Sequence, residues 1–277
     1  MKTLYIVATP IGNLEDITLR ALRVLKEVDI IAAEDTRHTR KLLQRYGISK
    51  QLTSYFEHNE LKKTEWLISQ LKLGKDIAVV SDAGTPGISD PGYRLINMAV
   101  ENSIPIVSIP GPSAIISALS IAGLPTDSFC FEGFIPSKVG ERQKLLASLK
   151  GTKKTIVFYE SPRRLLITLA DINNILGDIN VVIAREMTKL HEEIVRGSVS
   201  KVLTDLSSRT IKGEITILVN PKSAEMHCNA PLPLIDEIRN LQKELSLPLK
   251  EIAKIIAEQR GIPKREVYKE ALKLKIG

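Results

Sequence analysis

The sequence predicts two successive α/β domains followed by a small helical unit. Over the first 220 residues, short β-branched runs alternate with segments of helical periodicity, which is typical of sheets covered by helices. From residue 234 onward, apolar residues recur at helical spacing only. With 277 residues, 43% of them apolar, the chain has room for two domains with packed cores.

The first domain is expected to span residues 1–122. Strands are predicted at 4–8, 29–33, 77–81 and 106–109, and helices at 18–27, 36–46, 60–73, 92–101 and 113–121. Because strands lead into helices, we expect a mostly parallel sheet with helices on both faces.

The second domain is expected to span residues 123–222. Its strands are predicted at 129–134, 155–160, 180–185, 193–197 and 214–220. The last three follow one another with little helix between them, which predicts a mixed sheet with antiparallel edges.

Residues 223–277 are expected to hold a linker and a helical unit. The polar, proline-containing stretch 221–233 is interpreted as the linker. Three helices are predicted at 234–245, 249–256 and 263–274, and the break at Gly261 resembles a helix-turn-helix. Residues 231–277 hold ten Lys and Arg against seven Asp and Glu, so the unit could dock on RNA. It could equally form a dimer or be a solvated cap.

Overall charge and cysteine content narrow the classes of protein. The net charge of +7 is compatible with a nucleic-acid partner, although it does not require one. Cys130 and Cys228 are far apart in sequence, so they form neither a disulfide framework nor a paired-cysteine zinc motif. The four histidines have no metal-ligand spacing, and no metal is expected. No apolar run of membrane-spanning length occurs, and a cytoplasmic location is expected.

Three loops rich in glycine and proline follow predicted parallel strands. They cover residues 9–14, 81–92 and 110–114. In an open α/β sheet, ligands bind beyond the carboxyl ends of the strands, and glycines there let the backbone approach a ligand. The dinucleotide fingerprint and the P-loop pattern are both missing from the sequence. The three loops therefore predict a different kind of ligand site.

Together, these loops make up a recognisable set of motifs. The stretches that carry the resemblance are 9–16, 33–37, 81–92, 110–114, 159–164 and 185–192. The chain resembles the tetrapyrrole-methylase superfamily, whose members have the two-domain class III methyltransferase fold. Within it, the motifs resemble the group that methylates small-subunit ribosomal RNA. The resemblance extends over nearly the whole chain, including the helical unit.

This resemblance implies a methyl donor, S-adenosylmethionine, bound in folded form between the two α/β domains. The residues expected to contact it are Pro10, Gly12, Gly84, Thr85, Ile88, Ser113 and Ala114 in the first domain, and Phe158, Tyr159, Ala184 and Glu214 in the second. The implied reaction is methylation of the ribose 2′-oxygen of a cytidine in 16S ribosomal RNA, in the decoding-centre region. The implied substrate is the assembled small subunit, and the implied enzyme is a homodimer.

Two other functions are compatible with the same fold. One is a small-molecule methylase of the tetrapyrrole type, although loop 9–14 has fewer glycines than those enzymes carry. The other is an RNA-binding assembly protein without catalytic activity.

Basic residues beside the loops are candidates for contact with RNA phosphates. Arg37, Arg40, Lys41 and Arg45 recur at helical spacing, which fits either a phosphate-binding stripe or a solvated face. Ser161 and Pro162 are expected to start a helix, with Arg163 and Arg164 in its first turn. Cations there oppose the helix dipole, so they indicate either an anion site or arginines held by Glu160.

Charged residues near predicted strand ends are candidates for catalysis. A hydroxyl that attacks a methyl group must lose its proton to a nearby carboxylate or neutral amine. We expect Asp35 and Lys189 to be the pair to test, the lysine with a lowered pKa. The alternative is that these charges only bridge the two domains.

Overall fold

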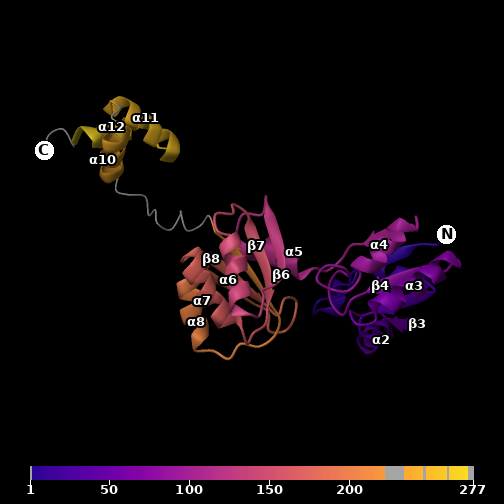
Figure 1. The fold of residues 1–277 in the computed structure, drawn as a ribbon. Coiled ribbons are helices and arrows are strands. Elements are labelled where there is room, and N and C mark those ends of the chain that lie inside the picture. Colours follow the sequence, from indigo (N-terminus) through magenta and orange to yellow (C-terminus); the bar gives the residue numbers. More distant parts are fainter. Residues whose placement is uncertain (1, 222–233, 246–247, 261, 274–277) are drawn as a thin grey trace. The chain divides into compact units, whose positions relative to one another are not determined.

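A computed structural model describes residues 2–221, 234–245, 248–260 and 262–273 (Figure 1). The chain divides into two compact units, Met1–Lys222 and Ser223–Gly277. The first unit contains two five-stranded sheets with their helices. The described part of the second unit contains three helices.

The first sheet has the strand order β3-β2-β4-β1-β5, and every pair in it is parallel. Its strands are β1 Leu4–Val7, β2 Ile30–Ala33, β3 Gln51–Ser54, β4 Ile77–Val80 and β5 Ile106–Ile109. The expectation of a mostly parallel sheet is confirmed. Strand β3 was not predicted, because this edge strand, QLTS, contains one large aliphatic residue and is only partly buried.

Helices cover both faces of the first sheet. They are α1 Leu19–Glu27, α2 Thr36–Arg45, α3 Glu60–Lys72 and α4 Tyr93–Glu101, and a short 3-10 turn, η1 Leu14–Asp16, precedes them. One core cluster joins the sheet to α1 and α2, with Leu25 and Leu43 among its members. Another joins the sheet to α3 and α4, with Leu67 and Leu95 among its members.

The second sheet is mixed, with the order β6-β7-β10-β8-β9. Its strands are β6 Phe129–Phe134, β7 Thr155–Glu160, β8 Asn180–Arg185, β9 Glu193–Ser198 and β10 Ile215–Asn220. Only β6 and β7 pair in parallel, and the other pairs are antiparallel, which confirms the mixed sheet.

Four helices accompany the second sheet, namely α5 Ala114–Ala122, α6 Val139–Ser148, α7 Leu165–Leu176 and α8 Val199–Ser207. The expectation of little helix among the last three strands is wrong, because α8 lies between β9 and β10. Ser198 caps α8 by accepting a hydrogen bond from the Lys201 N–H, and Val199, Val202 and Leu206 form its buried side. Helix α5 packs on this sheet although it ends the predicted first domain.

Side-chain alternation along β7 decides which residues face α5. Val157 and Tyr159 pack in the cluster formed with α5. Adjacent strand residues point to opposite faces, so Phe158 points away from α5. It is in register with Ile217 of β10, which is itself in register with Ile183 of β8. Phe158 is fully buried on that second face.

The second unit consists of α10 Leu234–Leu245, α11 Leu249–Arg260 and α12 Lys264–Lys273. These are the three helices predicted there. Ile238, Ile252, Ile256 and Val267 form the centre of its own hydrophobic core. Apart from Pro221, the predicted linker lies outside the described residues. Over the described ranges, no helix is both long and apolar enough to cross a lipid bilayer.

Replacing Phe158 with alanine is expected to lower the free energy of unfolding by about 3–5 kcal/mol, because it opens a cavity in a closed core. Phe134→Ala is the matched control, since that ring is 62% exposed. The control loses mainly its contact with Tyr159, about 1 kcal/mol. Urea unfolding of both variants measures the difference, and equal losses would contradict the placement of Phe158.

Candidate functional site

The three glycine- and proline-rich loops of the first sheet are bonded to one another. Thr9 and Gly84 exchange backbone hydrogen bonds of 2.9 and 3.0 Å, which join the loops after β1 and β4. Gly84 has a φ of +82°, a conformation that favours glycine. The Thr85 hydroxyl lies 3.5 Å from the Pro112 carbonyl and so links the second loop to the third. The three loops therefore form one surface.

Buried Glu60 holds the far end of the long loop 81–92. Its Oε1 accepts hydrogen bonds from the Tyr55 hydroxyl at 3.0 Å and from the Gly92 N–H at 3.3 Å. Its other oxygen pairs with Arg94 at 3.2 Å. Because Tyr55 is 1% exposed, this anchor is fixed in the core of the first sheet. The loop is therefore held at both ends.

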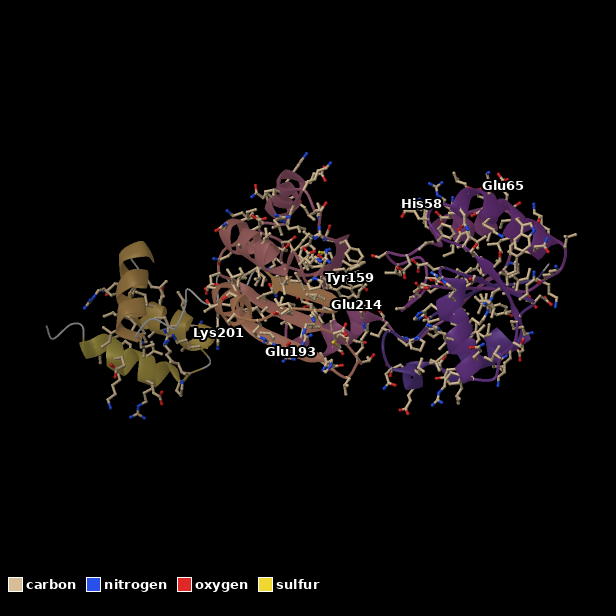
Figure 2. The ribbon with its side chains drawn as sticks, turned by 90° about the horizontal axis from the view of Figure 1, so that it is seen from below. His58, Glu65, Tyr159, Glu193, Lys201 and Glu214 are labelled. Atoms are coloured by element: carbon tan, nitrogen blue, oxygen red, sulfur yellow. The ribbon has the colours of Figure 1, made fainter. Side chains whose placement is uncertain are left out.

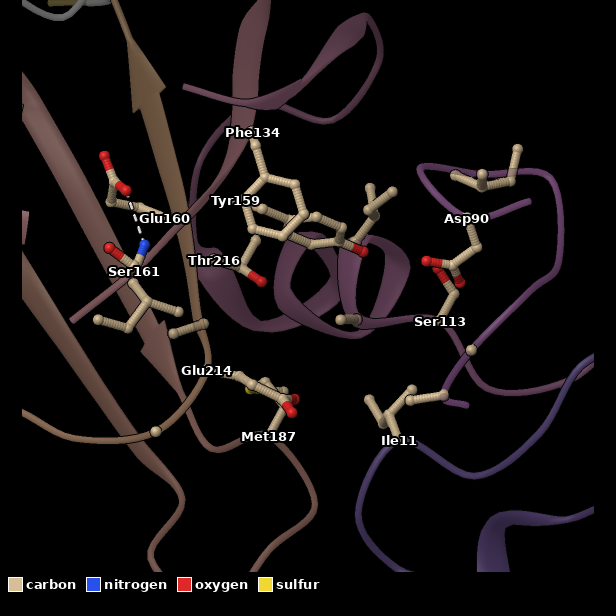
Figure 3. A pocket seen from close by; sticks show the side chains of 18 of the residues that line it. Ile11, Asp90, Ser113, Phe134, Tyr159, Glu160, Ser161, Met187, Glu214 and Thr216 are labelled. Atoms are coloured by element: carbon tan, nitrogen blue, oxygen red, sulfur yellow. Dashed lines mark hydrogen bonds between the residues drawn. The ribbon is translucent and has the colours of Figure 1, made fainter. Parts of the chain in front are cut away.

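Both sheets contribute to a cavity of about 370 Å³, shown in Figure 3. A cavity of this size fits a cofactor-sized molecule. The first sheet and its loops supply Ile11, Ala83, Gly84, Thr85, Ile88 and Asp90, and the start of α5 supplies Ser113, Ala114 and Ile115. The second sheet and its loops supply Phe134, Tyr159, Glu160, Ser161, Pro162, Ala184, Met187 and 213–216.

Tyr159 is the central aromatic residue of the cavity. Its ring contacts Phe131 edge to face at a centroid distance of 4.9 Å and the tilted ring of Phe134 at 5.3 Å. Burial, together with the carboxylates of Asp90 and Glu214, raises the pKa of Tyr159 to about 12. The hydroxyl is therefore neutral at ordinary pH. Figure 2 shows Tyr159 and Glu214 close together among the side chains of the second sheet.

Three carboxylates line the cavity, and they differ in their partners. Glu160 is buried, pairs with Arg164 at 2.6 Å and accepts hydrogen bonds from Thr168 and from the Ser161 N–H. Glu214 pairs with Lys189 at 3.1 Å. Asp90 has no cationic partner among the described residues. None of the Lys and Arg side chains that the structure describes lines the cavity, so its electrostatic field favours a cation.

The environment of Asp90 makes it an unusual acid. Burial, followed by the nearby carboxylates of Glu34 and Asp82, raises the pKa of Asp90 to about 6, against a hydrogen bond from Ser81. Burial also raises the pKa of Glu34. Both carboxylates lie beside Asp82, whose N–H donates to Glu34 at 3.2 Å.

The loop after β8 lies against the first loop of the chain. Thr188 accepts a hydrogen bond of 3.0 Å from the Asn13 N–H. A Cβ at Gly12 would overlap the Cγ of Lys189 and lie 2.8 Å from the Thr188 hydroxyl oxygen. Glu186 and Thr188 have positive φ angles of 51° and 65°, which are costly for residues with side chains. This strained loop joins the two sheets beside the cavity.

Eight of the eleven residues expected to contact the donor line the cavity, namely Gly84, Thr85, Ile88, Ser113, Ala114, Tyr159, Ala184 and Glu214. The other three do not line it. Pro10 and Gly12 flank the lining residue Ile11, and Phe158 faces the opposite side of β7. Their contact with a donor is not supported by this geometry.

The two residues expected to act in catalysis are both engaged elsewhere. Asp35 caps α2 and pairs with Arg37 at 2.9 Å. Hydrogen bonds from the Arg37 side chain and backbone lower the pKa of Asp35 to about 2. For Lys189, burial lowers the pKa, but hydrogen bonds to Glu186 and Glu214 outweigh it and raise the pKa overall. The expectation of a lowered lysine pKa is therefore wrong, and neither residue lines the cavity.

The residues expected to contact RNA divide into free and paired groups. Arg40, Lys41 and Arg45 are exposed on α2, and among the described residues none has an ion-pair partner. Arg37 pairs with Asp35.

The helix after β7 begins later than expected. Arg163 and Arg164 lie in a turn before Leu165, because the Arg164 N–H donates to the Ser161 carbonyl and closes that turn. Arg164 is then held by Glu160, Ser161 and the Ile135 carbonyl. Arg163 is exposed next to the lining residue Pro162 and has no ion-pair partner in the described chain.

Three of the lining residues not predicted to contact the donor are central to the cavity. Asp90 lies in the predicted loop 81–92, Met187 lies in the stretch 185–192, and Phe134 ends the predicted strand 129–134, but none was singled out. An acid between two glycine turns could have been noticed. Phe134 gave no signal, since an aromatic residue ending a strand is common.

Comparison with known proteins decides the family. The family model "Tetrapyrrole (Corrin/Porphyrin) Methylases" matches residues 3–203. This chain belongs to the tetrapyrrole methylase family. The predicted tetrapyrrole-methylase fold is thereby confirmed. The solved structure of the methyltransferase CobJ shares the fold of this tetrapyrrole methylase, with a TM-score of 0.60 and 18% identity, covering 79% of this chain and 94% of CobJ.

Two relatives of this tetrapyrrole methylase are named ribosomal RNA small subunit methyltransferase I. The one from Escherichia coli O157:H7 is 48% identical over 97% of this chain and 94% of its own length. The one from Thermotoga maritima is 51% identical over 222 residues, which cover 80% of this chain and all of the relative.

S-adenosylmethionine is the methyl donor of this family, and the cavity fits it. The donor carries a positively charged sulfur and an ammonium group, and the cavity offers carboxylates and aromatic rings without a competing cation. The donor also carries a carboxylate, and the first turn of α5 at Ala114 and Ile115 presents N–H groups that need partners. Tyr159 and Phe134 can hold its adenine or its sulfonium.

Arg164→Ala is expected to lower the free energy of unfolding by about 3 kcal/mol, because it leaves the buried Glu160 carboxylate without its cation. Arg163→Ala, its neighbour and matched control, is expected to change it by less than about 0.5 kcal/mol. Urea unfolding at neutral pH measures both. Equal effects would mean that Arg164 does not stabilise Glu160.

Proposed function

We propose that this chain transfers a methyl group to ribosomal RNA of the small ribosomal subunit, at the ribose 2′-oxygen of a cytidine in the decoding-centre region of 16S RNA. The observation that carries the proposal is similarity over 97% of the chain to a relative named for small-subunit ribosomal RNA. The cytidine and its 2′-oxygen rest on the motif resemblance in loops 9–16, 81–92 and 159–164.

Free positive charge outside the cavity supports a polyanionic substrate. The cavity lining carries carboxylates, whereas Arg40, Lys41 and Arg45 on α2 and Arg163 beside Pro162 are exposed and unpaired in the described chain. Helix α2 is capped by Asp35, whose N–H donates to the Asp82 carboxylate of the long loop at 3.0 Å. These three residues of α2, Arg40, Lys41 and Arg45, form a basic stripe that starts next to a loop lining the cavity. We propose that these cations contact RNA phosphates.

The chain's own residues contribute positioning and exclusion of water. When bound, S-adenosylmethionine supplies a methyl group on a cationic sulfur. The three bonded loops and α5 fix one side of the cavity, and Tyr159 and Phe134 fix the other. Holding the attacking oxygen about 3–3.5 Å from the methyl carbon can account for much of the rate.

A small-molecule methylase of the tetrapyrrole type is the alternative with the same fold. The named relatives at 48–51% identity favour RNA over a porphyrin-like substrate. The proposal of an assembly protein without catalytic activity is less well supported, because the cavity is present and lined by acids and aromatic residues.

Methyl transfer to small subunits is the direct test. Purified protein and labelled donor, added to small subunits from cells that lack this protein, are expected to place one methyl group on one cytidine of 16S RNA. Mass mapping of RNA fragments identifies the nucleotide and the sugar. Ala114→Phe, which fills the cavity, is expected to abolish transfer, whereas Ile116→Phe on the exposed side of α5 is not. If the wild-type protein modifies neither subunits nor their RNA, the proposal fails.

The basic stripe is tested by removing charge without reversing it. The double variant Arg40→Gln, Lys41→Gln is expected to bind small subunits more weakly and to reduce the slope of log affinity against log salt by about 2. The matched control is Lys144→Gln, Lys150→Gln on and beside α6, where both lysines are exposed. An unchanged salt slope in the stripe variant would show that α2 does not contact phosphate.

The second unit is proposed as an accessory docking module. The Thermotoga maritima relative is matched over its whole length by 222 residues, the length of the first unit. A chain ending at residue 222 is therefore expected to bind S-adenosylhomocysteine like the full chain and to bind small subunits more weakly. If the shortened chain binds small subunits as tightly as the full chain, the second unit is assigned to self-association instead. Light scattering of both chains measures that self-association. Homodimerisation and the cytoplasmic location stay predictions.

A further inference from the structure

The reaction needs a proton acceptor, and most charged groups near the cavity cannot serve. Glu160 is buried and its oxygens are occupied by Arg164, Thr168 and the Ser161 N–H. Glu214 is 74% exposed and paired with Lys189. Both are therefore neutralised by a cation.

The two residues favoured by the sequence are no better. With its pKa lowered to about 2, Asp35 is a weak base, and it does not line the cavity. Lys189 has a raised pKa and carries its proton at neutral pH, so it has no free electron pair to accept another.

Asp90 is the remaining carboxylate of the cavity lining. It lines the cavity, and in the described chain no Lys or Arg pairs with it. Two residues further on, the Gly92 N–H is bonded to buried Glu60, which fixes the end of its loop. Figure 3 shows the Asp90 carboxylate and the Tyr159 ring projecting into the same space from opposite sides. A substrate atom placed there would meet a held carboxylate.

We propose that Asp90 accepts the proton of the attacking hydroxyl, an inference that rests on the proposed function. In this step the hydroxyl oxygen forms a bond to the methyl carbon as the carbon–sulfur bond breaks. The electron pair of the broken bond stays on sulfur, which becomes a neutral thioether. The hydroxyl proton moves to a carboxylate oxygen of Asp90 and later passes to water.

The groups around Asp90 suit it to this task. Glu34 at the end of β2 and Asp82 in the long loop repel its charge, the Ser81 hydroxyl opposes the rise in its pKa, and Tyr159 faces it from β7. A carboxyl with a pKa of about 6 is mostly ionised at pH 7–8, and it is a stronger base than an ordinary aspartate.

Asp90→Asn tests the proposal, because asparagine keeps the shape and cannot accept the proton. Single-turnover methyl transfer to saturating small subunits is expected to fall at least about 100-fold. The affinity for S-adenosylhomocysteine, measured by calorimetry, is expected to fall no more than about fivefold, because the two other carboxylates and both aromatic rings of the cavity remain. Asp205→Asn, an exposed acid on α8, is the control for the substitution itself.

Two pH measurements separate a base from a structural residue. The wild-type single-turnover rate is expected to rise with pH around a midpoint near 6, and Asp90→Asn is expected to lose that rise. Independently of activity, carboxyl-carbon NMR of the free protein is expected to show one aspartate titrating near pH 6 that Asp90→Asn removes. Melting temperatures of both proteins establish that the variant is folded.

Three outcomes would overturn the proposal. They are a variant rate within about threefold of wild type, a loss of S-adenosylhomocysteine affinity as large as the loss of rate, and an unchanged pH profile. The second would assign Asp90 to binding the donor's ammonium group. If the wild-type protein itself transfers no methyl group to small subunits, the proposed function fails, and the role of Asp90 fails with it. An active wild type with an equally active variant refutes Asp90 alone.

Discussion

The geometry of the cavity depends on the contact between Gly12 and the strained loop after β8. Thr188 and Lys189 occupy the space that a side chain at position 12 would need, and the Asn13 N–H is bonded to Thr188. Gly213 does the same for Glu186, because a Cβ there would overlap the Glu186 side chain. Two positive φ angles, each costing about 1–3 kcal/mol, are maintained by these contacts. Gly12 thus leaves room for loops of the two sheets to lie together, and Gly213 leaves room for Glu186 within the second sheet.

The three acids of the cavity differ in whether a neighbouring cation offsets their charge. Glu160 is fully enclosed and tied to Arg164, and Glu214 is largely exposed and tied to Lys189. Asp90 has no ion-pair partner in the described chain, and the carboxylates of Glu34 and Asp82 lie near it. Asp90 is therefore the carboxylate of the cavity whose charge is not offset by a cation of the described chain, and it is the one free to take part in proton transfer.

The positions of most strands along the chain, and the loops that carry the site, follow from local sequence signals, whereas side-chain roles do not. Buried parallel strands such as Ile77–Val80 are recognisable from their apolar runs, and the loops that follow them carry glycine and proline. Edge strand β3 lacks that signal.

Neighbouring residues can also lie in different surroundings, which local sequence does not reveal. Phe158 and Tyr159 are adjacent and aromatic, but the pleat of β7 sends them to opposite faces, so the choice between them needs the register of the sheet. Arg163 and Arg164 look equivalent in sequence, yet only one of them reaches Glu160. Such distinctions depend on contacts between distant parts of the chain, which no local pattern records.

The separate core of the second unit has an evolutionary consequence. Ile238, Ile252, Ile256 and Val267 pack in a cluster formed by α10, α11 and α12 themselves. A substitution at one of these four residues is expected to act first on that cluster. The second unit can thus diverge, be exchanged or be lost without loss of the first unit. The shorter Thermotoga maritima relative, whose whole length is matched by 222 residues, is consistent with such a loss.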